Sequence, residues 1–190
     1  MSKDKRQLVV LTILFGMLFM YASSISAQSP IFYLWGDEEK VRCDVYPVGP
    51  YIAFNVYVFL IPGADGAFAA EYKLTGLPGH FMIAHEPGPL ASGATLGNPF
   101  GPPGFSVSFI MCLTEPTWVW KVECMAPDMD PGYYTLEPHD ETGFFGVALC
   151  SGDRPLVDGW LYGQFGYNSD GWCRFGTEES SWGAIKALYQ

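Results

Sequence analysis

The stretch IAFNVYVFLI, residues Ile52–Ile61, is almost wholly apolar and rich in β-branched and aromatic residues. It contains neither Gly nor Pro, whereas Pro50 precedes it and Pro62-Gly63 follows it, so both ends carry turn signals. This composition favours a strand that is buried over most of its length, with a helix as the weaker alternative. We expect its odd positions, which include Asn55, to form the less buried face of a central antiparallel strand.

The residues on either side repeat this pattern as short apolar and aromatic runs separated by Gly, Pro, Asn and Asp. The turn signals recur at intervals of about 8 to 15 residues, which is typical of a sandwich or barrel and not of an α/β protein. We therefore predict an all-β fold, an antiparallel two-sheet β-sandwich. Besides the central one, the expected strands are Ile31–Trp35, Val41–Tyr46, Phe68–Leu74, Phe81–Ala84, Phe105–Leu113, Trp118–Met125, Tyr133–Leu136, Phe145–Cys150, Trp160–Phe165 and Gly171–Phe175.

Two segments allow more specific predictions. In FSVSF (Phe105–Phe109) the apolar residues share one face and the serines share the other. Because Thr114–Thr117 carries a proline at a turn position, we predict that Phe105–Leu113 and Trp118–Met125 form a hairpin. The segment Glu86–Gly104 instead holds five prolines and many glycines, so it cannot be a central strand. We expect it to be a long irregular loop, either a binding loop or a cover over a sheet edge.

The N-terminal residues have the layout of a cleavable secretory signal peptide. A basic start (Lys3, Lys5 and Arg6) precedes an apolar run, and small residues then extend to Ala27. The apolar run is short of the roughly 20 residues that span a bilayer, which makes an uncleaved anchor the weaker alternative. We predict a signal peptide over residues 1–27 and one β-sandwich domain over residues 28–176, exported to the periplasm, the outer surface or the extracellular space.

The chain is strongly acidic, with 20 acidic against 10 basic residues and a net charge of −10. Removal of residues 1–27 takes away three basic residues and one acidic residue, so the net charge of the mature chain becomes −12. Such a surface repels the phosphates of nucleic acids and of anionic membranes, and no basic patch offsets it. We expect no nucleic-acid partner and, after signal cleavage, no membrane span.

Cysteines in an exported protein indicate disulfide bonds before metal sites. No two cysteines of the mature chain have the short spacing of a zinc knuckle. Two disulfides and one spare thiol are expected, and the spacing leaves the pairing open. The candidates are Cys43, Cys112, Cys124, Cys150 and Cys173.

A linker and a short helix are predicted at the C-terminus, residues 177–190. Serines precede an apolar stripe at helical spacing that consists of Trp182, Ile185 and Leu188. A helix this short is not stable alone in water. It must therefore dock either on its own domain or on another protein.

Candidate metal ligands are acidic side chains in two loops. Asp128 and Asp130 alternate before a glycine, and Asp140 and Glu141 follow shortly afterwards. Calcium is the cofactor that these residues suit best, because Ca²⁺ takes several carboxylate oxygens from flexible loops. Ordinary acidic turns explain the same residues. If two of these carboxylates faced each other across a cleft, they would instead indicate a small secreted hydrolase.

Aromatic residues are the second group of candidates. We predict ligand binding by Trp160, Tyr162 and Trp172, because an exposed row of aromatic rings suits sugars. Trp118 and Trp120 are expected to share one strand face, and filling of a sandwich core explains such pairs equally well. The sequence contains no GxSxG, HExxH or phosphate-loop motif, so no catalytic residue is assigned.

Several runs resemble those of exported β-sandwich proteins of unknown function from environmental Gram-negative bacteria. These runs are FYLWGDE at Phe32–Glu38, AAEYKL at Ala69–Leu74 and the tail ESSWGAIKALY at Glu179–Tyr189. The resemblance implies a secreted β-sandwich with no established catalytic residues.

A strand like Phe54–Leu60, a glycine turn and a strand like Phe68–Leu74 are also similar to the same elements of cohesin-like domains. That similarity implies a protein-binding module at the cell surface. We therefore predict a non-catalytic binding or structural module with a protein or glycan partner. The alternatives are a carbohydrate-binding module and the acidic-residue hydrolase.

Overall fold

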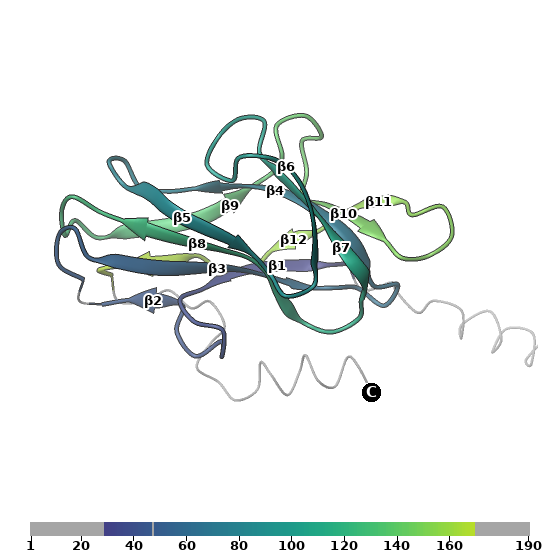
Figure 1. Cartoon of the computed structure of the whole chain (residues 1–190), viewed down its shortest axis with the longest axis horizontal. Coiled ribbons are helices and arrows are strands. Elements are labelled where there is room, and N and C mark those ends of the chain that lie inside the picture. Colours follow the sequence, from purple (N-terminus) through teal and green to yellow (C-terminus); the bar gives the residue numbers. More distant parts are fainter. Residues whose placement is uncertain (1–28, 47, 170–190) are drawn as a thin grey trace, which may run out of the picture.

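The computed structural model of the chain describes residues 29–46 and 48–169, which form two β-sheets packed face to face (Figure 1). The predicted all-β two-sheet sandwich is confirmed. The signal peptide (1–27), the strand expected at Gly171–Phe175 and the C-terminal helix (177–190) lie outside the described residues.

The first sheet has five strands and is built around the stretch on which the sequence centres. Strand β3 pairs antiparallel with β1 on one side and with β8 on the other. The sheet runs, in order, β12 (Trp160–Leu161), β1 (Ile31–Trp35), β3 (Ala53–Ile61), β8 (Thr117–Met125) and β5 (Phe81–Pro87).

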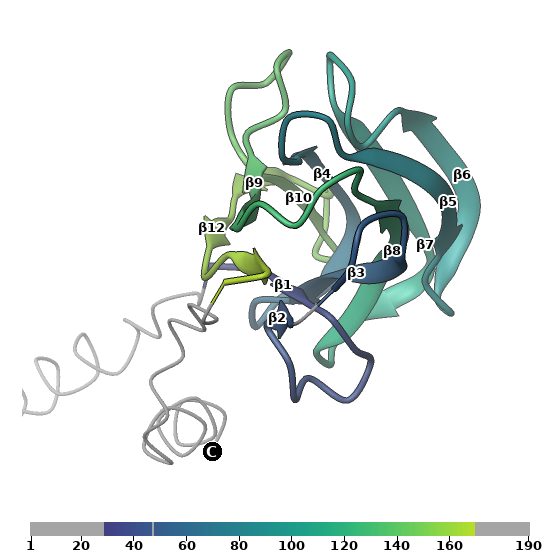
Figure 2. The same cartoon turned by 90° about the vertical axis from the view of Figure 1, so that its left-hand side faces the viewer.

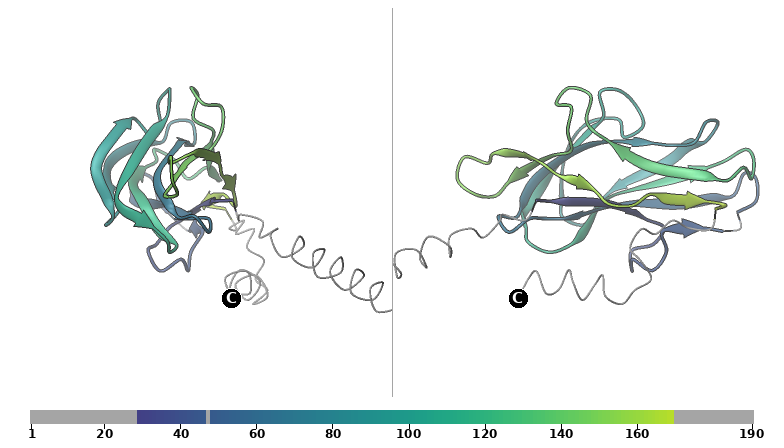
Figure 3. Two further views of the ribbon diagram at one scale, coloured as in Figure 1. Left: turned by 90° about the vertical axis from the view of Figure 1, so that its right-hand side faces the viewer. Right: turned by 180° about the vertical axis from the view of Figure 1, so that it is seen from behind.

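The second sheet has eight strands, and β4 (Ala67–Thr75) is its hub because it pairs with β7, β9 and β10. Figure 3 shows this sheet and the first one from two further sides. The remaining strands are β2 (Asp44–Val45), β6 (Ala91–Gly97), β7 (Phe105–Leu113), β9 (Gly132–Glu137), β10 (Gly146–Leu149), β11 (Leu156–Asp158) and β13 (Phe165–Tyr167).

Both faces of β3 are buried. Its even positions, Phe54 to Leu60, belong to the large core between the sheets. Its odd positions Tyr57, Phe59 and Ile61 form a second cluster on the opposite face with Tyr33. The prediction of a less buried odd face was wrong for these three residues and fits the exposed Ala53 and the half-buried Asn55.

The segment that follows β1 helps to cover this second cluster. The Lys40 amine lies 5.4 Å from the centre of the Phe59 ring, and the Tyr57 hydroxyl donates to the Glu38 carboxylate at 3.5 Å. An aromatic ring attracts a cation over its face. The outer face of β3 is therefore packed by a polar connection and not by a third layer of secondary structure among the described residues.

The predicted hairpin of Phe105–Leu113 and Trp118–Met125 was wrong. Strand β7 pairs with β4 and β6, whereas β8 pairs with β3 and β5, so the connection between them crosses from one sheet to the other. Strands in a hairpin and strands in two facing sheets show the same alternation of apolar and polar residues. The local pattern therefore could not distinguish the two arrangements.

The irregular loop expected over Glu86–Gly104 contains a strand, β6, which pairs with β7 at the edge of the larger sheet. The prolines of this segment all lie outside Ala91–Gly97. The sequence did not predict β6 because its small residues show no apolar alternation, and a strand at the edge of a sheet needs little of it. The expectation that this segment is not a central strand holds.

Trp118 and Trp120 do not share a face. Consecutive β3 residues Val58 and Phe59 pair with Trp120 and Trp118, so β8 contains one extra residue at this point. Such a β-bulge reverses the side-chain alternation locally. Trp120 consequently packs in the main core, 4.3 Å from Phe105 between ring centres, and Trp118 joins the outer cluster.

Three of the five cysteine predictions are confirmed. Cys112 and Cys150 form a disulfide with their Cα atoms 5.8 Å apart, and Cys43 is disulfide-bonded as well. Cys124 is a free, buried thiol, which agrees with the expectation of one spare thiol. Burial raises the pKa of Cys124 to about 12, which keeps it protonated and unreactive. Cys173 lies outside the described residues.

Replacement of both Cys112 and Cys150 by Ala should lower the free energy of unfolding. The two residues are 38 positions apart, and a cross-link over such a loop restricts the unfolded chain by roughly 2 to 4 kcal/mol. Urea unfolding followed by tryptophan fluorescence measures the loss.

Gly66→Ala should also destabilise the region around this disulfide. Gly66 has φ = +68°, and a side chain there would overlap Cys112 Sγ. Wild-type stability in both variants would contradict this account.

Candidate functional site

The outer face of the larger sheet carries two continuous rows of side chains that face one another across neighbouring strands. The first row crosses four strands and consists of Leu156, Ala148, Ala69 and Ser108. The second row crosses five strands and consists of Asp158, Gly146, Glu71, Ser106 and Leu96. We call these nine residues the platform.

Alternation along each strand places the platform outside. The intervening residues Ala70, Val107 and Val147 are buried in the core between the sheets, so their neighbours point the other way. Apart from Glu71, the middle of the platform is occupied by Gly, Ala and Ser, which makes most of its floor shallow. Its two ends carry exposed leucines, Leu96 at 76% and Leu156 at 46% exposure.

Glu71 lies in the centre of the second row. Its side chain runs over Gly146, where any larger residue would overlap it. The Glu71 Oε1 atom is buried and accepts no hydrogen bond from any residue in the described ranges. A buried carboxylate oxygen without a donor costs free energy, and a shift of the Glu71 side chain toward a donor on a bound molecule would recover it.

Two loops stand side by side above this sheet, next to the platform (Figures 1 and 2). They are residues 98–104, which follow β6, and residues 138–145, which follow β9. The Asp140 amide donates to the Pro103 carbonyl at 2.7 Å, and the Leu74 amide donates to the Pro99 carbonyl at 2.7 Å. His139 is buried against Gly104. We call this pair of loops the wall.

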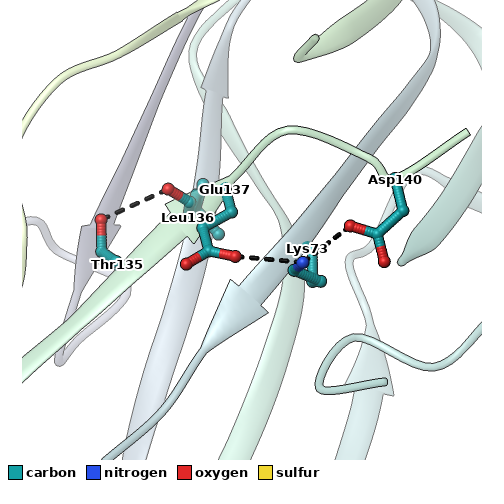
Figure 4. Close-up of polar contacts among 5 residues, drawn as sticks. All are labelled: Lys73, Thr135, Leu136, Glu137 and Asp140. Atoms are coloured by element: carbon teal, nitrogen blue, oxygen red, sulfur yellow. Dashed lines mark hydrogen bonds and ion pairs between the residues drawn. The ribbon is translucent and has the colours of Figure 1, made fainter. Parts of the chain in front are cut away.

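Lys73 ties the wall to β4. Its Nζ lies 2.7 Å from Asp140 Oδ1 and 3.1 Å from Glu137 Oε2 (Figure 4). Hydrogen bonds to Asp140 and then Glu137 raise the pKa of Lys73, and the bond from Lys73 lowers the pKa of Glu137. The two carboxylates leave a net negative charge around Lys73. The platform, which contains Glu71 and Asp158, adds further negative charge beside it.

The predicted calcium ligands lie at opposite ends of β9. Asp128 and Asp130 precede the strand, and Asp140 and Glu141 follow it. A six-residue strand is about 20 Å long, so the two pairs do not form one site. Asp128 Oδ1 accepts from the Asp130 amide at 3.1 Å, and Asp140 is held by Lys73.

Among residues 29–46 and 48–169, no group of three or more His, Cys, Asp or Glu side chains is arranged to hold a metal. Calcium binding and acidic-residue hydrolysis stay predictions.

Two of the predicted aromatic ligand-binding residues lie at the β12 edge of the first sheet. Trp160 is 67% and Tyr162 40% exposed, and they occupy alternate positions of one extended segment beside β1. The Trp160 amide donates to Pro30 and the Tyr162 amide to Phe32, at 2.8 and 2.7 Å. The two rings therefore face the same side. Trp172 lies outside the described residues.

The sequence showed only part of the platform. The serines of β7, Ser106 and Ser108, were recognised as the polar face of their strand, and they do lie outside. Ala69, Gly146 and Ala148 carry no chemical signal of their own. Only strand pairing brings them together.

With the geometry described, the chain can be compared with known proteins. No family model and no curated protein sequence matches it. The third cohesin of ScaC from Acetivibrio cellulolyticus, solved in complex with the ScaB dockerin, superimposes with a TM-score of 0.50 at 12% identity. The match covers 72% of this chain and 96% of that one. The fold is cohesin-like.

Two other cohesin structures give similar matches. A type I cohesin from Clostridium thermocellum, solved in a cohesin–dockerin complex, matches with a TM-score of 0.48 and 11% identity over 72% of this chain and 97% of that one. A non-cellulosomal cohesin from the archaeon Archaeoglobus fulgidus matches with a TM-score of 0.46 and 10% identity over 80% and 100%. Within the described residues, no helix is long and apolar enough to span a membrane.

Lys73→Met should loosen the wall, because Asp140 and Glu137 then lose their common cation. We expect several-fold faster deuterium uptake in peptides that cover residues 138–145, measured by hydrogen exchange and mass spectrometry.

Lys121→Met is the matched control for that experiment. The Lys121 side chain is 22% exposed against 23% for Lys73, and it pairs with Glu86 on the other sheet. Equal exchange of the wall in both variants would contradict the assigned role of Lys73.

Proposed function

We propose that this chain is a non-catalytic protein-binding module and that the platform is its docking surface. The observation that carries the proposal is that two rows of mostly small side chains cross the sheet without interruption. Exposed Leu156 lies at one end of the first row, and exposed Leu96 lies at the opposite end of the second row. A flat, shallow floor lets the backbone or a helix of a partner approach closely, and the leucines supply apolar area at both ends.

The fold supports the same class of function by analogy. The Acetivibrio cohesin was solved with a dockerin bound, so a sandwich of this architecture serves there as a protein receptor. At 12% identity the likeness concerns the fold, and a fold does not determine a function. The platform of this chain is therefore the basis of the proposed binding.

The charges indicate what the partner presents. The chain carries a net charge of −10, and Glu71 places a half-buried carboxylate side chain in the middle of the platform. We propose a partner that places an Arg or Lys over Glu71 and apolar side chains against Leu96 and Leu156. A charge-assisted hydrogen bond in a desolvated position is strong and favours a specific orientation.

The proposed location is outside the cytoplasm, as for an exported or envelope protein. The disulfide between Cys112 and Cys150 supports this proposal, because such bonds persist in oxidising compartments. The N-terminal pattern supports it as well.

A photo-crosslinking experiment tests the docking surface. A benzoyl-phenylalanine at position 96 of the full-length chain, expressed in the source organism, should form a covalent adduct with one defined protein. Glu71→Lys in the same chain should reduce the adduct at least tenfold, because it places a like charge opposite the basic partner residue. Gel shift followed by mass spectrometry measures both.

Val41 provides the matched position for the crosslinker. It is 74% exposed, close to the 76% of Leu96, but lies in the connection after β1 and outside the platform. The same adduct at both positions, or an adduct that Glu71→Lys leaves unchanged, would count against docking on the platform.

Carbohydrate binding by Trp160 and Tyr162 is a second candidate function. The observation that favours it is that the two rings are exposed on the same side of one extended segment. Sugars stack on such rings through their apolar faces. The purified domain should then bind to a defined group of glycans on an array, and Trp160→Ala should abolish the signal. An array without signal for the wild-type domain would exclude this function.

A further inference from the structure

A cavity of about 360 Å³ opens between the two sheets near the start of β5. The connection from β4 to β5 passes from one sheet to the other here and contributes His80, while β5 contributes Phe81 and Met82. Phe100 of the wall lines another side. Phe81 is 45% exposed, so the cavity reaches the surface.

A missing side chain helps to keep this cavity open. Gly76 lines the cavity, and a Cβ atom at this position would lie 3.0 Å from the Phe100 ring and 3.1 Å from the Tyr134 ring. Any larger residue would press on both rings or fill the space. The rings in turn pack on the core, since Tyr134 lies 5.9 Å from Phe54 between centres. The cavity is therefore bounded on this side by Tyr134, which is fixed in the core, and by the half-buried Phe100.

Three polar groups at the inner end are joined in one chain. The Tyr134 hydroxyl is hydrogen-bonded to His80 Nδ1 at 2.7 Å and also to the Cys124 thiol. A tyrosine hydroxyl has one hydrogen to donate and can also accept, so one group links the other two. Tyr134 is fully buried, and Cys124 is 1% exposed. These contacts fix the direction of each polar group in the cavity.

The cavity is uncharged. None of the described residues that line it is an Asp, Glu, Lys or Arg. Burial lowers the pKa of His80 and raises the pKa of Tyr134, so both side chains are neutral near pH 7. Asp128 acts in the opposite direction on His80 but is the smaller effect. An ionised ligand would find no opposite charge here and would lose its hydration.

The size and the lining together indicate a ligand. Small-molecule sites commonly have volumes of roughly 300 to 1,000 Å³, apolar and aromatic walls and a few fixed polar groups. Phe81, Met82 and Phe100 present apolar surface, and the half-buried His80 presents a hydrogen-bonding group, with Asn98 as a further polar lining residue. Aromatic pairs favour edge-to-face or offset stacking with a ring that enters between them.

We infer that this cavity is a binding site for a small uncharged aromatic compound that carries one hydroxyl group. The ring would lie between the side chains of Phe81, Phe100 and Met82, and the hydroxyl group would hydrogen-bond to His80, whose Nδ1 atom is held by the Tyr134 hydroxyl. The site is separate from the platform and does not depend on the proposed protein-binding function.

Titration of the chain with 2-naphthol tests the site. Methionines labelled with ¹³C at the methyl group report on Met82, and a Met82→Leu variant assigns its resonance. We expect a saturable shift of the Met82 methyl signal with 2-naphthol. Naphthalene-2-carboxylate, which has a similar ring system but is ionised, should bind at least tenfold more weakly, because the cavity holds no cation.

The β4–β5 connection supplies a cavity-filling variant, and β5 supplies its control. In a chain with Gly76→Leu, which fills the cavity, the affinity for 2-naphthol should fall at least tenfold. Ile83→Trp adds more volume on β5 but at a residue that is 42% exposed and does not line the cavity, so its affinity should match the wild type. If Gly76→Leu does not fold, Leu77→Trp fills the same space and keeps the Met82 reporter.

Three results would overturn the inference. They are the absence of a saturable shift up to the solubility limit of 2-naphthol, equal binding of the carboxylate, and unchanged affinity in a folded cavity-filling variant. Loss of platform crosslinking with normal 2-naphthol binding would contradict only the protein-binding proposal.

Discussion

The register of β4 is the constraint on which the rest of the structure depends. Its residues Ala70, Tyr72 and Leu74 point into the core between the sheets, and Ala69, Glu71 and Lys73 point outward. Because the side-chain period of a strand is two, a shift by one residue would bury Glu71 and Lys73 and expose the two large core residues. Core packing therefore also fixes the positions of the platform and of the base of the wall.

The two sheets differ in what their outer faces do. The outer face of the five-stranded sheet holds large aromatic residues, and the segment with Glu38 and Lys40 packs over part of it. The outer face of the larger sheet holds small residues and a carboxylate oxygen without a donor. Side chains of the same chain stabilise the first face, whereas a bound molecule that supplies a hydrogen-bond donor would stabilise the second.

The general type of fold followed from the sequence, because alternation and turn residues are local properties. The bounds of β1 and β7 agree with the predicted ranges, and β3 differs from its prediction by one residue. The pairing of β7 with β8 and the face of Trp118 were wrong. Both depend on which strand lies alongside, and neither pairing partners nor a bulge in the middle of β8 is encoded in a period of two.

Some residues of the candidate sites could be named from the sequence, whereas others became visible only in the structure. Acidic and aromatic residues stand out in a sequence, and they were named, but the carboxylates proved to lie at the two ends of β9. Other positions are important because their residues are small and leave room for neighbouring side chains. These are Gly76, Ala69 and Gly146, and no sequence pattern marks such positions. The sequence by itself determined the acidic charge, the strand-rich composition and the cysteines available for bonding. Only the tertiary structure decided that Cys124 stays free, that Glu71 lies over Gly146, and that an uncharged cavity lies between the sheets. Each of these features depends on contacts between residues that are distant in the chain.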